Sequence, residues 1–386
     1  MVNAPPLIGG LEILASRVAQ GLQHCGDTSQ IICRFTSQRH GLAAYFQRSE
    51  GSGSRVIGGV HTVLIPLRWW QRLLWLPLFR LIWRPATFSL AVALHNAVMV
   101  PQLLRQLKGS QIVHFLGTGP DLLGFAAASA ATRLGIPLVV EPALHPGQWG
   151  DSWIDLNLYQ RAQLVLAHSH AEHNTLVRMG LSSERITVIT PGVDALSGGD
   201  PLRFRREHQI PSSTSLILFL GRKTPEKGVI RLLQAFADVR SQLQDVCLIL
   251  AGPANPDLNT NPQQGVLDLD DLSEIEKQDA LAACSLLCVP SEGESFGLVY
   301  YEAWQYRKPV VALDLPSLRE SIQAHYAGLL VSPHDHEALV RALISLLTQP
   351  SLAATIGLNG SALVEQHIWP RAIHSYRQAY QELLPG

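Results

Sequence analysis

Residues 290–303 read PSEGESFGLVYYEA, and this stretch decides the fold. An apolar run, Leu286–Val289, leads into it, and a helix-like segment follows. Proline, serine and glycine at the start predict a short turn between strand and helix. Such a turn places free backbone N–H groups at the N-terminus of the helix, where phosphates and other anions bind.

Two glutamates, Glu294 and Glu302, lie eight positions apart in this stretch. Eight residues are about two helical turns, so the sequence predicts both carboxylates on roughly one face. Carboxylates accept hydrogen bonds from sugar hydroxyls. A ligand with phosphates at the N-terminus of the helix and sugar hydroxyls at the two carboxylates would be a nucleotide sugar.

Strand-like and helix-like segments alternate along the whole chain of 386 residues, which predicts an α/β fold of doubly wound parallel sheets. The strand-like runs are 30–35, 60–66, 112–116, 137–141, 164–168, 186–190, 215–221, 246–252, 286–290, 309–313 and 328–331. They form two series, and the break falls in the turn-rich stretch 192–201. Ligands of open α/β sheets bind beyond the carboxyl ends of strands, so a cleft between two such domains is expected.

Five blocks, in order, resemble the retaining GT-B glycosyltransferases of family 4. The stretch above matches the E-x7-E signature of that family, and FLGRKTPEKG at residues 219–228 matches its G-R-x4-K-G loop. The other three are GGLE at 9–12, ITPGVD at 189–194, and AGLLV at 327–331 with Asp335. Any one block is weak evidence, but five in the right order are strong.

The resemblance implies a GT-B fold with two Rossmann-like domains facing across a cleft. The first would span residues 1–195 and the second 196–369, with a terminal helix, 370–386, crossing back onto the first. The first strand of the N-terminal sheet is missing, because residues 1–6 lead straight into the GG loop. Either the start codon is assigned too late or a buried strand has been lost, and both explanations stay open.

The resemblance also assigns the donor site. Glu302 would bind the ribose hydroxyls of the nucleotide and Glu294 the transferred sugar. Backbone N–H groups of Phe296, Gly297 and Leu298 would reach the diphosphate or the sugar, because glycine permits close approach. The alternatives without a binding role are that Glu302 only complements the dipole of its helix and that Glu294 is a solvent-exposed acid in a turn.

Arg222 and Lys227 match the basic pair of the family. Two fixed cations would stabilise the negative charge that grows on the diphosphate leaving group, so no metal or other cofactor is expected. An ordinary basic loop is the less favoured alternative, since cations at a helix N-terminus oppose its dipole. Lys223 is off the motif and is expected to face solvent. The pair Cys284 and Cys288 has no nearby metal ligand, so no metal site is predicted.

The N-terminal half supplies fewer site residues. Gly10 matches a glycine that approaches the donor phosphates, although two successive glycines are also a common turn. His145 resembles the family histidine near the reaction centre, with a spacing from its strand two residues longer than expected. His114 is expected to be structural, and Glu141 is a further candidate on the acceptor side.

Residues 51–120 contain no acidic side chain and seven cations. Within them, residues 68–84 read RWWQRLLWLPLFRLIWR, which as one helix kinked at Pro77 places four arginines within an arc of about 160°. A basic edge beside aromatic and aliphatic residues is typical of a helix in a membrane interface. A core helix with a solvated arginine edge, or a transmembrane span, are the alternatives.

The function predicted from the sequence is sugar transfer, with retention, from a nucleoside diphosphate sugar to a lipid-linked or polysaccharide acceptor. A net charge of −1 gives no case for nucleic acid as a partner. The N-terminus lacks the pattern of a signal peptide, so the expected location is the cytoplasm, with peripheral contact at the inner face of its membrane. A nucleotide-sugar epimerase and a non-catalytic nucleotide-sugar-binding remnant are the rival functions.

Overall fold

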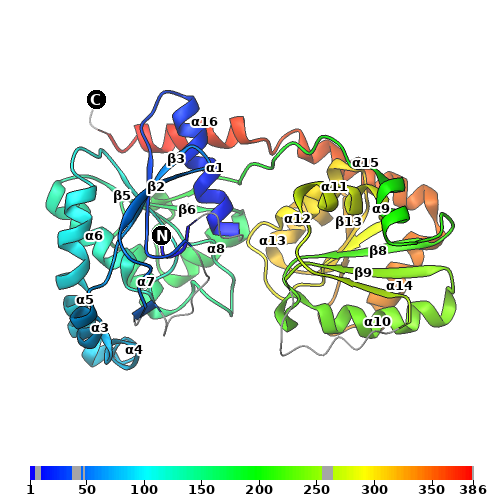
Figure 1. Cartoon of the computed structure of the whole chain (residues 1–386), viewed down its shortest axis with the longest axis horizontal. Helices are drawn as coiled ribbons and strands as arrows, with labels where there is room; N and C mark the ends of the chain where they lie inside the picture. Colours follow the sequence, from blue (N-terminus) through cyan, green and yellow to red (C-terminus); the bar gives the residue numbers. More distant parts are fainter. Residues whose placement is uncertain (5–9, 37–44, 47, 254–263, 385–386) are drawn as a thin grey trace. The chain divides into compact units, whose positions relative to one another are not determined.

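The computed structural model describes residues 1–4, 10–36, 45–46, 48–253 and 264–384, which fold into two units (Figure 1). Unit 1 contains Met1–Gly192 and Trp369–Gly386, and unit 2 contains Val193–Ile368. The sequence places these boundaries at residues 195/196 and 369/370, close to the observed positions.

Unit 2 is built on one parallel sheet of six strands in the order β10-β9-β8-β11-β12-β13. Helices α10 and α14 lie on one face of this sheet, and α11 and α12 lie on the other (Figure 1). Strands β8 and β9 read SLILFL and VCLILA, because strands covered on both faces carry few polar residues. Its strands are β8 (Ser215–Leu220), β9 (Val246–Ala251), β10 (Val266–Leu269), β11 (Leu286–Cys288), β12 (Val310–Leu313) and β13 (Gly328–Val331).

The helices of unit 2 join these strands in the predicted alternation. They are α9 (Pro201–Glu207), η2 (Pro225–Lys227), α10 (Val229–Gln242), α11 (Glu274–Ala283), α12 (Leu298–Gln305), α13 (Pro316–Leu318), η3 (Arg319–Gln323), α14 (His336–Thr348) and α15 (Pro350–Val364). Strands β8 and β11 are neighbours, with Leu218 opposite Leu287, so the loops that follow them leave the same edge of the sheet. This edge carries the predicted donor residues.

Unit 1 contains two separate sheets, a three-stranded one in the order β1-β3-β2 and a four-stranded parallel one in the order β4-β5-β6-β7. Strand β2 pairs antiparallel with β3, a hairpin that the sequence analysis does not predict. The strands are β1 (Gln30–Cys33), β2 (Gly53–Ile57), β3 (Val60–Leu64), β4 (Val113–Leu116), β5 (Leu138–Glu141), β6 (Leu164–Ala167) and β7 (Ile186–Val188). The helices are α1 (Gly10–His24), α3 (Trp69–Trp75), α4 (Leu78–Leu81), α5 (Pro85–Gln106), α6 (Leu123–Leu134), α7 (Trp153–Tyr159), α8 (His170–Met179), η1 (Ser183–Arg185) and α16 (Trp369–Gln381).

The strands of unit 1 form two sheets rather than one continuous sheet. Among the described residues before β1, the strand pairing consists of one isolated bridge between Asn3 and Phe35. The amide of Arg34 donates to the carbonyl of Val2 at 2.9 Å, so the first residues continue the pairing of β1 in the parallel direction. A cavity of about 940 Å³ is lined by residues of α1, β1 and β4, among others.

The terminal helix α16 belongs to unit 1, as the resemblance implies. Gly21 of α1 admits it, because a Cβ at that position would lie 2.3 Å from Cγ1 of Ile373. Ile373 and Tyr376 are buried in the same apolar cluster as Leu14 and Val18 of α1. The helix therefore completes the core of the unit that begins at the other end of the chain.

Residues 68–84 form two short helices, α3 and α4, separated at Pro77, where one kinked helix is predicted. Proline lacks an N–H donor and cannot continue the helical ladder. The next helix, α5, is long and apolar enough to cross a membrane by length and composition, the single such helix in the described part of the chain unless the bent pair α14–α15 is counted as another span. Its Phe88, Met99 and Leu103 belong to the core of unit 1, where α5 packs mainly against α6.

Candidate functional site

The basic loop after β8 packs directly against the turn after β11. Gly228 ends this loop with φ +79°, and a Cβ there would lie 2.0 Å from the carbonyl oxygen of Pro290. The amide of Glu292 donates to the carbonyl of Glu226 at 2.8 Å. Glycine at position 228 therefore lets the loop that carries Arg222 and Lys227 approach the turn that carries Glu294.

Lys227 and Glu294 form an ion pair, with Nζ 2.5 Å from Oε1. The lysine side chain is 21% exposed and the glutamate side chain 11%, so most of the surface of both is shielded from water. Arg222 lies exposed in the same loop. The structure thus brings together two of the predicted catalytic residues, although 67 positions separate them in the chain.

Glu294 and Glu302 do not share a helical face, so that expectation is wrong. Helix α12 begins only at Leu298, after Gly297 in the left-handed conformation with φ +79°. Glu294 precedes the helix, and the hydroxyl of Ser317 donates to its carbonyl oxygen at 2.6 Å. The glycine interrupts the helical path between the two carboxylates, which therefore meet different cations.

Glu302 lies on α12 and pairs with Lys277 of α11. The Nζ atom of Lys277 is 3.0 Å from Oε1 of Glu302 and 2.9 Å from Oε2 of Glu274. Burial raises the pKa of Glu302, and the charge of Lys277 opposes that rise. The sequence analysis misses Lys277, because only its local pairing with Glu274 is visible as an i, i+3 pattern.

The turn before α12 is anchored by an aromatic side chain. The ring of Phe296 is 7% exposed and stacks on Tyr301 with centroids 4.5 Å apart. It also lies 5.8 Å from the ring of His367. The side chain of Phe296 is thus committed to the core, while α12 starts at Leu298 with the unpaired N–H groups of a helix N-terminus.

Lys223 does not face solvent, contrary to expectation. It is 2% exposed and forms an ion pair with Asp268 of β10. A buried ammonium needs such a partner. Lys223 therefore joins the basic loop to the edge strand of the sheet and is separate from the pair Lys227–Glu294.

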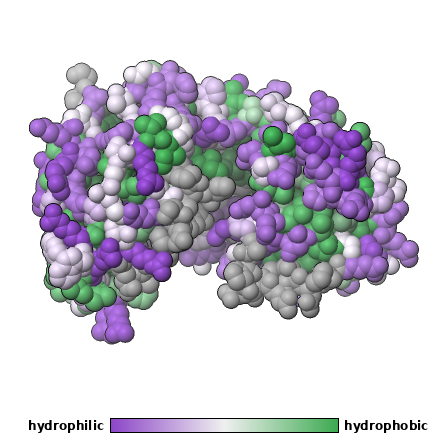
Figure 2. Space-filling view, viewed as in Figure 1, coloured by the Kyte–Doolittle hydropathy of each residue, from purple (hydrophilic) through white to green (hydrophobic). Residues whose placement is uncertain are grey.

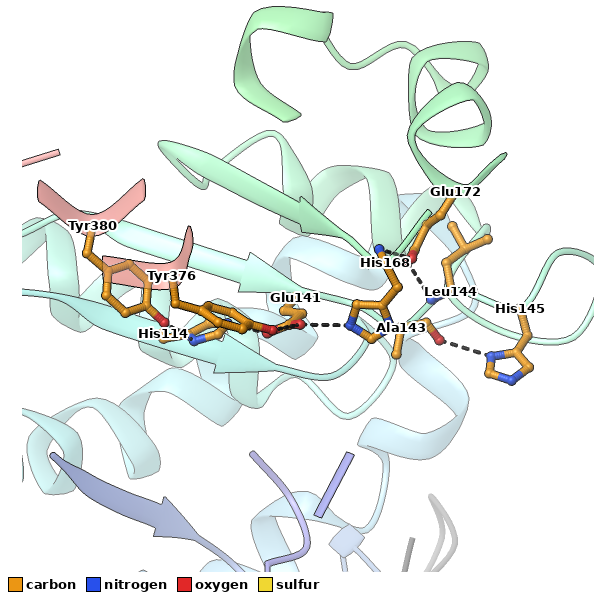
Figure 3. A network of polar contacts seen from close by, with 9 residues as sticks. All are labelled: His114, Glu141, Ala143, Leu144, His145, His168, Glu172, Tyr376 and Tyr380. Carbon is orange, nitrogen blue, oxygen red and sulfur yellow. Dashed lines mark hydrogen bonds and ion pairs between the residues drawn. The ribbon is translucent and has the colours of Figure 1, made fainter. Parts of the chain in front are cut away.

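A buried polar cluster occupies the core of unit 1, at the end of β5 (Figure 3). Its centre is Glu141, which is fully buried and accepts hydrogen bonds from the hydroxyl of Tyr376 at 2.6 Å and from Nε2 of His168 at 2.7 Å. His114 Nε2 lies 3.0 Å from the second carboxylate oxygen, and the hydroxyl of Tyr380 is 2.8 Å from His114 Nδ1.

Both His114 and Glu141 belong to this cluster. Burial alone would raise the pKa of Glu141, but His114 and His168 outweigh burial and hold it at about 2. The contacts of His114 agree with the structural role expected of it. Glu141 is fully buried and bonded to Tyr376 of α16, so the structure lends no support to its acceptor-side role, which stays a prediction.

His145 lies in the loop that follows β5, and Figure 3 shows its ring directed away from the Glu141 cluster. Its Nδ1 is 3.0 Å from the carbonyl of Ala143, and its ring lies 4.0 Å from that of Trp149. The buried carboxylate of Glu172 accepts from the amides of Leu144 and His168, both at 2.7 Å. Glu172, which the sequence analysis misses, therefore ties the loop of His145 to the end of β6.

Gly10 is the first residue of α1 and is exposed. A Cβ at this position would meet no atom within 4 Å, so packing does not require glycine there. Gly9, the other half of the motif, lies outside the described residues.

Two family models match this chain. "Glycosyltransferase Family 4" matches residues 8–195, and "Glycosyl transferases group 1" matches residues 202–362. Together they account for the body of both units. The chain belongs to the group 1, family 4 glycosyltransferases.

Curated relatives of this glycosyltransferase include D-inositol 3-phosphate glycosyltransferases. That of Gordonia bronchialis is 28% identical over 242 residues, which cover 58% of this chain and 53% of the relative. One from Catenulispora acidiphila is 28% identical over 304 residues, with 69% and 71% covered. The chain thus spans about half the length of the first relatives it matches.

Solved structures support the GT-B fold of the glycosyltransferase. HepE of Anabaena in complex with UDP and glucose aligns with a TM-score of 0.74 at 20% identity, over 99% of this chain and 100% of that one. Sucrose-phosphate synthase of Thermosynechococcus elongatus aligns with a TM-score of 0.72 at 18% identity, with 99% of each chain covered. These likenesses confirm two Rossmann-like α/β domains.

Proposed function

We propose that this glycosyltransferase moves a sugar, with retention of configuration, from a nucleoside diphosphate sugar to an acceptor bound by unit 1. One observation carries the proposal: neighbouring strands β8 and β11 deliver Arg222, Lys227 and Glu294 to one edge of the unit 2 sheet, where α12 begins. This edge offers cations and helix N–H groups to a diphosphate. The complex of HepE with UDP and glucose supports the same donor class.

The basic pair would take the part that a metal ion plays in other glycosyl transfers. As the glycosidic bond breaks, negative charge grows on the diphosphate, and cations fixed in advance stabilise it. Lys227 is already held at one position by Glu294. His145, in the loop that Glu172 braces, is proposed to lie near the reacting sugar.

The donor assignment is tested by Glu302→Ala. Two ribose hydroxyls would lose a charged acceptor worth about 1.5–3 kcal/mol, so the affinity for the free nucleoside diphosphate should fall about 10- to 100-fold. Titration calorimetry with UDP, GDP and ADP measures this directly. Glu337→Ala, on the exposed face of α14, is the matched control. Unchanged affinity in the Glu302 variant would remove the ribose assignment.

The acceptor is proposed to be lipid-linked or a growing envelope polysaccharide, reached at a membrane surface. In Figure 2 the lower left of the molecule, where α3 and α4 lie, is a mixed surface of hydrophilic residues with small hydrophobic areas at its edge. Of the side chains in 68–84, three large apolar ones, Trp75, Leu78 and Ile82, are fully buried and hold the helices on the core. The exposed ones are Trp69, Trp70, Leu73, Leu74, Leu76, Phe79 and Trp83.

This exposed set favours the interfacial hypothesis over a core helix with a solvated edge. A core helix would bury most of its apolar residues, whereas here Trp69 is 73% exposed and Leu73 57% exposed. Large apolar patches rimmed by charge mark interaction sites. With Arg68, Arg72, Arg80 and Arg84 beside it and no acid in residues 51–120, the patch suits an anionic bilayer.

Replacing these four arginines by glutamine should release the protein from anionic vesicles. Each cation near such a surface contributes about 1 kcal/mol, and the attraction falls with salt. Co-sedimentation with phosphatidylglycerol-containing vesicles and with neutral vesicles, at low and high salt, measures it. The control replaces four exposed arginines elsewhere: Arg133, Arg178, Arg206 and Arg371. Equal binding to both vesicle types, or to neither, would contradict the membrane role of this patch.

A further inference from the structure

Lys277 is the cation that contacts Glu302, and nothing in the predicted donor motif includes it. It reaches across from α11 to α12, and its side chain is 17% exposed against 26% for Glu302. Its second partner, Glu274, is 74% exposed. The ammonium group is therefore shared between a carboxylate in the proposed ribose site and one in solvent.

The place of Lys277 is unfavourable for a cation unless a carboxylate faces it. It lies in the first turn of α11, whose N-terminus is capped by Ser273 and Glu276, and a helix N-terminus repels positive charge. Burial also disfavours its charged form, and Glu302 and Glu274 outweigh that effect. The helix thus holds the ammonium group where the carboxylates of Glu302 and Glu274 stabilise it.

Glu302 in turn is stabilised in its charged form by Lys277. It is partly buried, and the carboxylates of Glu274 and Asp194 both favour its protonated form. The hydroxyl of Tyr306, just beyond the end of α12, completes the titratable groups around it. A protonated carboxyl accepts fewer and weaker hydrogen bonds than a carboxylate.

We propose that Lys277 is a positioning residue of the nucleotide site, which keeps Glu302 ionised and aimed at the ribose hydroxyls. A carboxylate has about four acceptor positions, so one ammonium group leaves room for two hydroxyls. This inference rests on the proposed function of Glu302. It adds a residue from a second helix to the recognition of the sugar of the nucleotide.

The test compares ligands that do and do not carry ribose hydroxyls. Lys277→Met keeps the length of the side chain and removes its charge, and Lys277→Gln is a second variant if the first folds poorly. Affinity for the tightest of UDP, GDP and ADP should fall about tenfold or more. Affinity for inorganic pyrophosphate and for the matching 2′,3′-dideoxynucleoside diphosphate should stay unchanged, since neither gives Glu302 its hydroxyls.

The pH dependence of nucleotide affinity distinguishes this role from a purely structural role of Lys277, which would not depend on the ionisation of Glu302. Lys277 opposes the rise in the pKa of Glu302, so without it the loss of nucleotide affinity should grow as the pH falls. Lys277→Arg should restore most of the affinity, because it returns the charge. Glu274→Gln removes the exposed partner of Lys277 and should leave the affinity within about twofold.

Two outcomes overturn the inference. An equal loss for nucleotide and pyrophosphate would mean that Lys277 acts on the diphosphate. No loss in Lys277→Met, alongside a loss in Glu302→Ala, would mean that Glu302 needs no help from Lys277. A Glu302→Ala variant with full affinity would instead remove the ribose assignment itself, so the two failures are distinguishable.

Discussion

Replacing Arg222 or Lys227 by alanine should lower turnover at saturating donor by about 10²–10³-fold. The loss should exceed the loss of binding to the free nucleoside diphosphate, because the charge on the leaving group grows only as the bond breaks. Lys227→Ala has a second consequence, since it also leaves Glu294 without the cation 2.5 Å away. Steady-state turnover and calorimetry on the same preparations separate the two effects.

The matched control for the basic pair is Arg341→Ala, which removes an arginine 64% exposed on α14. It should leave turnover unchanged. On the proposal that the two cations take the role of a metal, chelators should not inhibit the wild-type protein. Near-normal turnover in both loop variants would show that the basic pair is not catalytic.

Glu141→Gln should destabilise unit 1 by about 3–5 kcal/mol, the usual cost of removing one partner from a buried ion pair. The substitution keeps the shape of the side chain but leaves His114 and His168 facing a neutral group. Tyr376→Phe removes one hydrogen bond and keeps the charge, so its effect should be smaller. Denaturant unfolding followed by tryptophan fluorescence measures both.

The cost of Glu141→Gln should depend on pH in a defined direction. The folded pKa of Glu141 is about 2 against an ordinary value of 4.5, so its contribution is fully present above pH 4.5 and lost as the pH falls toward 2. The pKa of His168 is raised above 6.5, because its hydrogen bond to Glu141 outweighs burial, so its contribution is lost as the pH rises through that folded value. The difference from wild type should therefore be largest between these limits.

Glu184→Gln, at an exposed glutamate of unit 1, is the control and should change stability by less than about 0.5 kcal/mol. If Glu141→Gln lies as close to wild type as this control, the buried cluster does not stabilise the unit. A constant difference across the acid range would mean instead that the charge of Glu141 is not what matters.

Local patterns in the sequence predict most of the sheets correctly, because buried parallel strands are short apolar runs between turn residues. All 11 predicted strand runs contain an observed strand. Strand β2 is missed because its residues are almost all exposed and show no alternation. Strand β10 is missed because it is a short strand at the edge of the sheet, and none of its residues is fully buried.

The donor motif could be read in the sequence because its residues follow the ends of two strands. Contacts between distant residues could not be read. The pairs Lys277–Glu302 and Glu141–Tyr376 join elements 25 and 235 positions apart, and no local period records them. The place of Glu294 outside the helix depends on the left-handed backbone of Gly297, a conformation that its neighbours in sequence do not dictate.

The position of α16 has a consequence for the order in which the protein matures on the ribosome. Residues 1–192 emerge first, then all of the continuous unit 2, and only then the helix that carries Ile373 and Tyr376. Until that helix emerges, Ile373 cannot pack against Gly21 of α1, and Glu141 lacks the hydrogen bond from the hydroxyl of Tyr376. Unit 1 therefore begins synthesis first but is completed last, after unit 2 has had time to fold on its own.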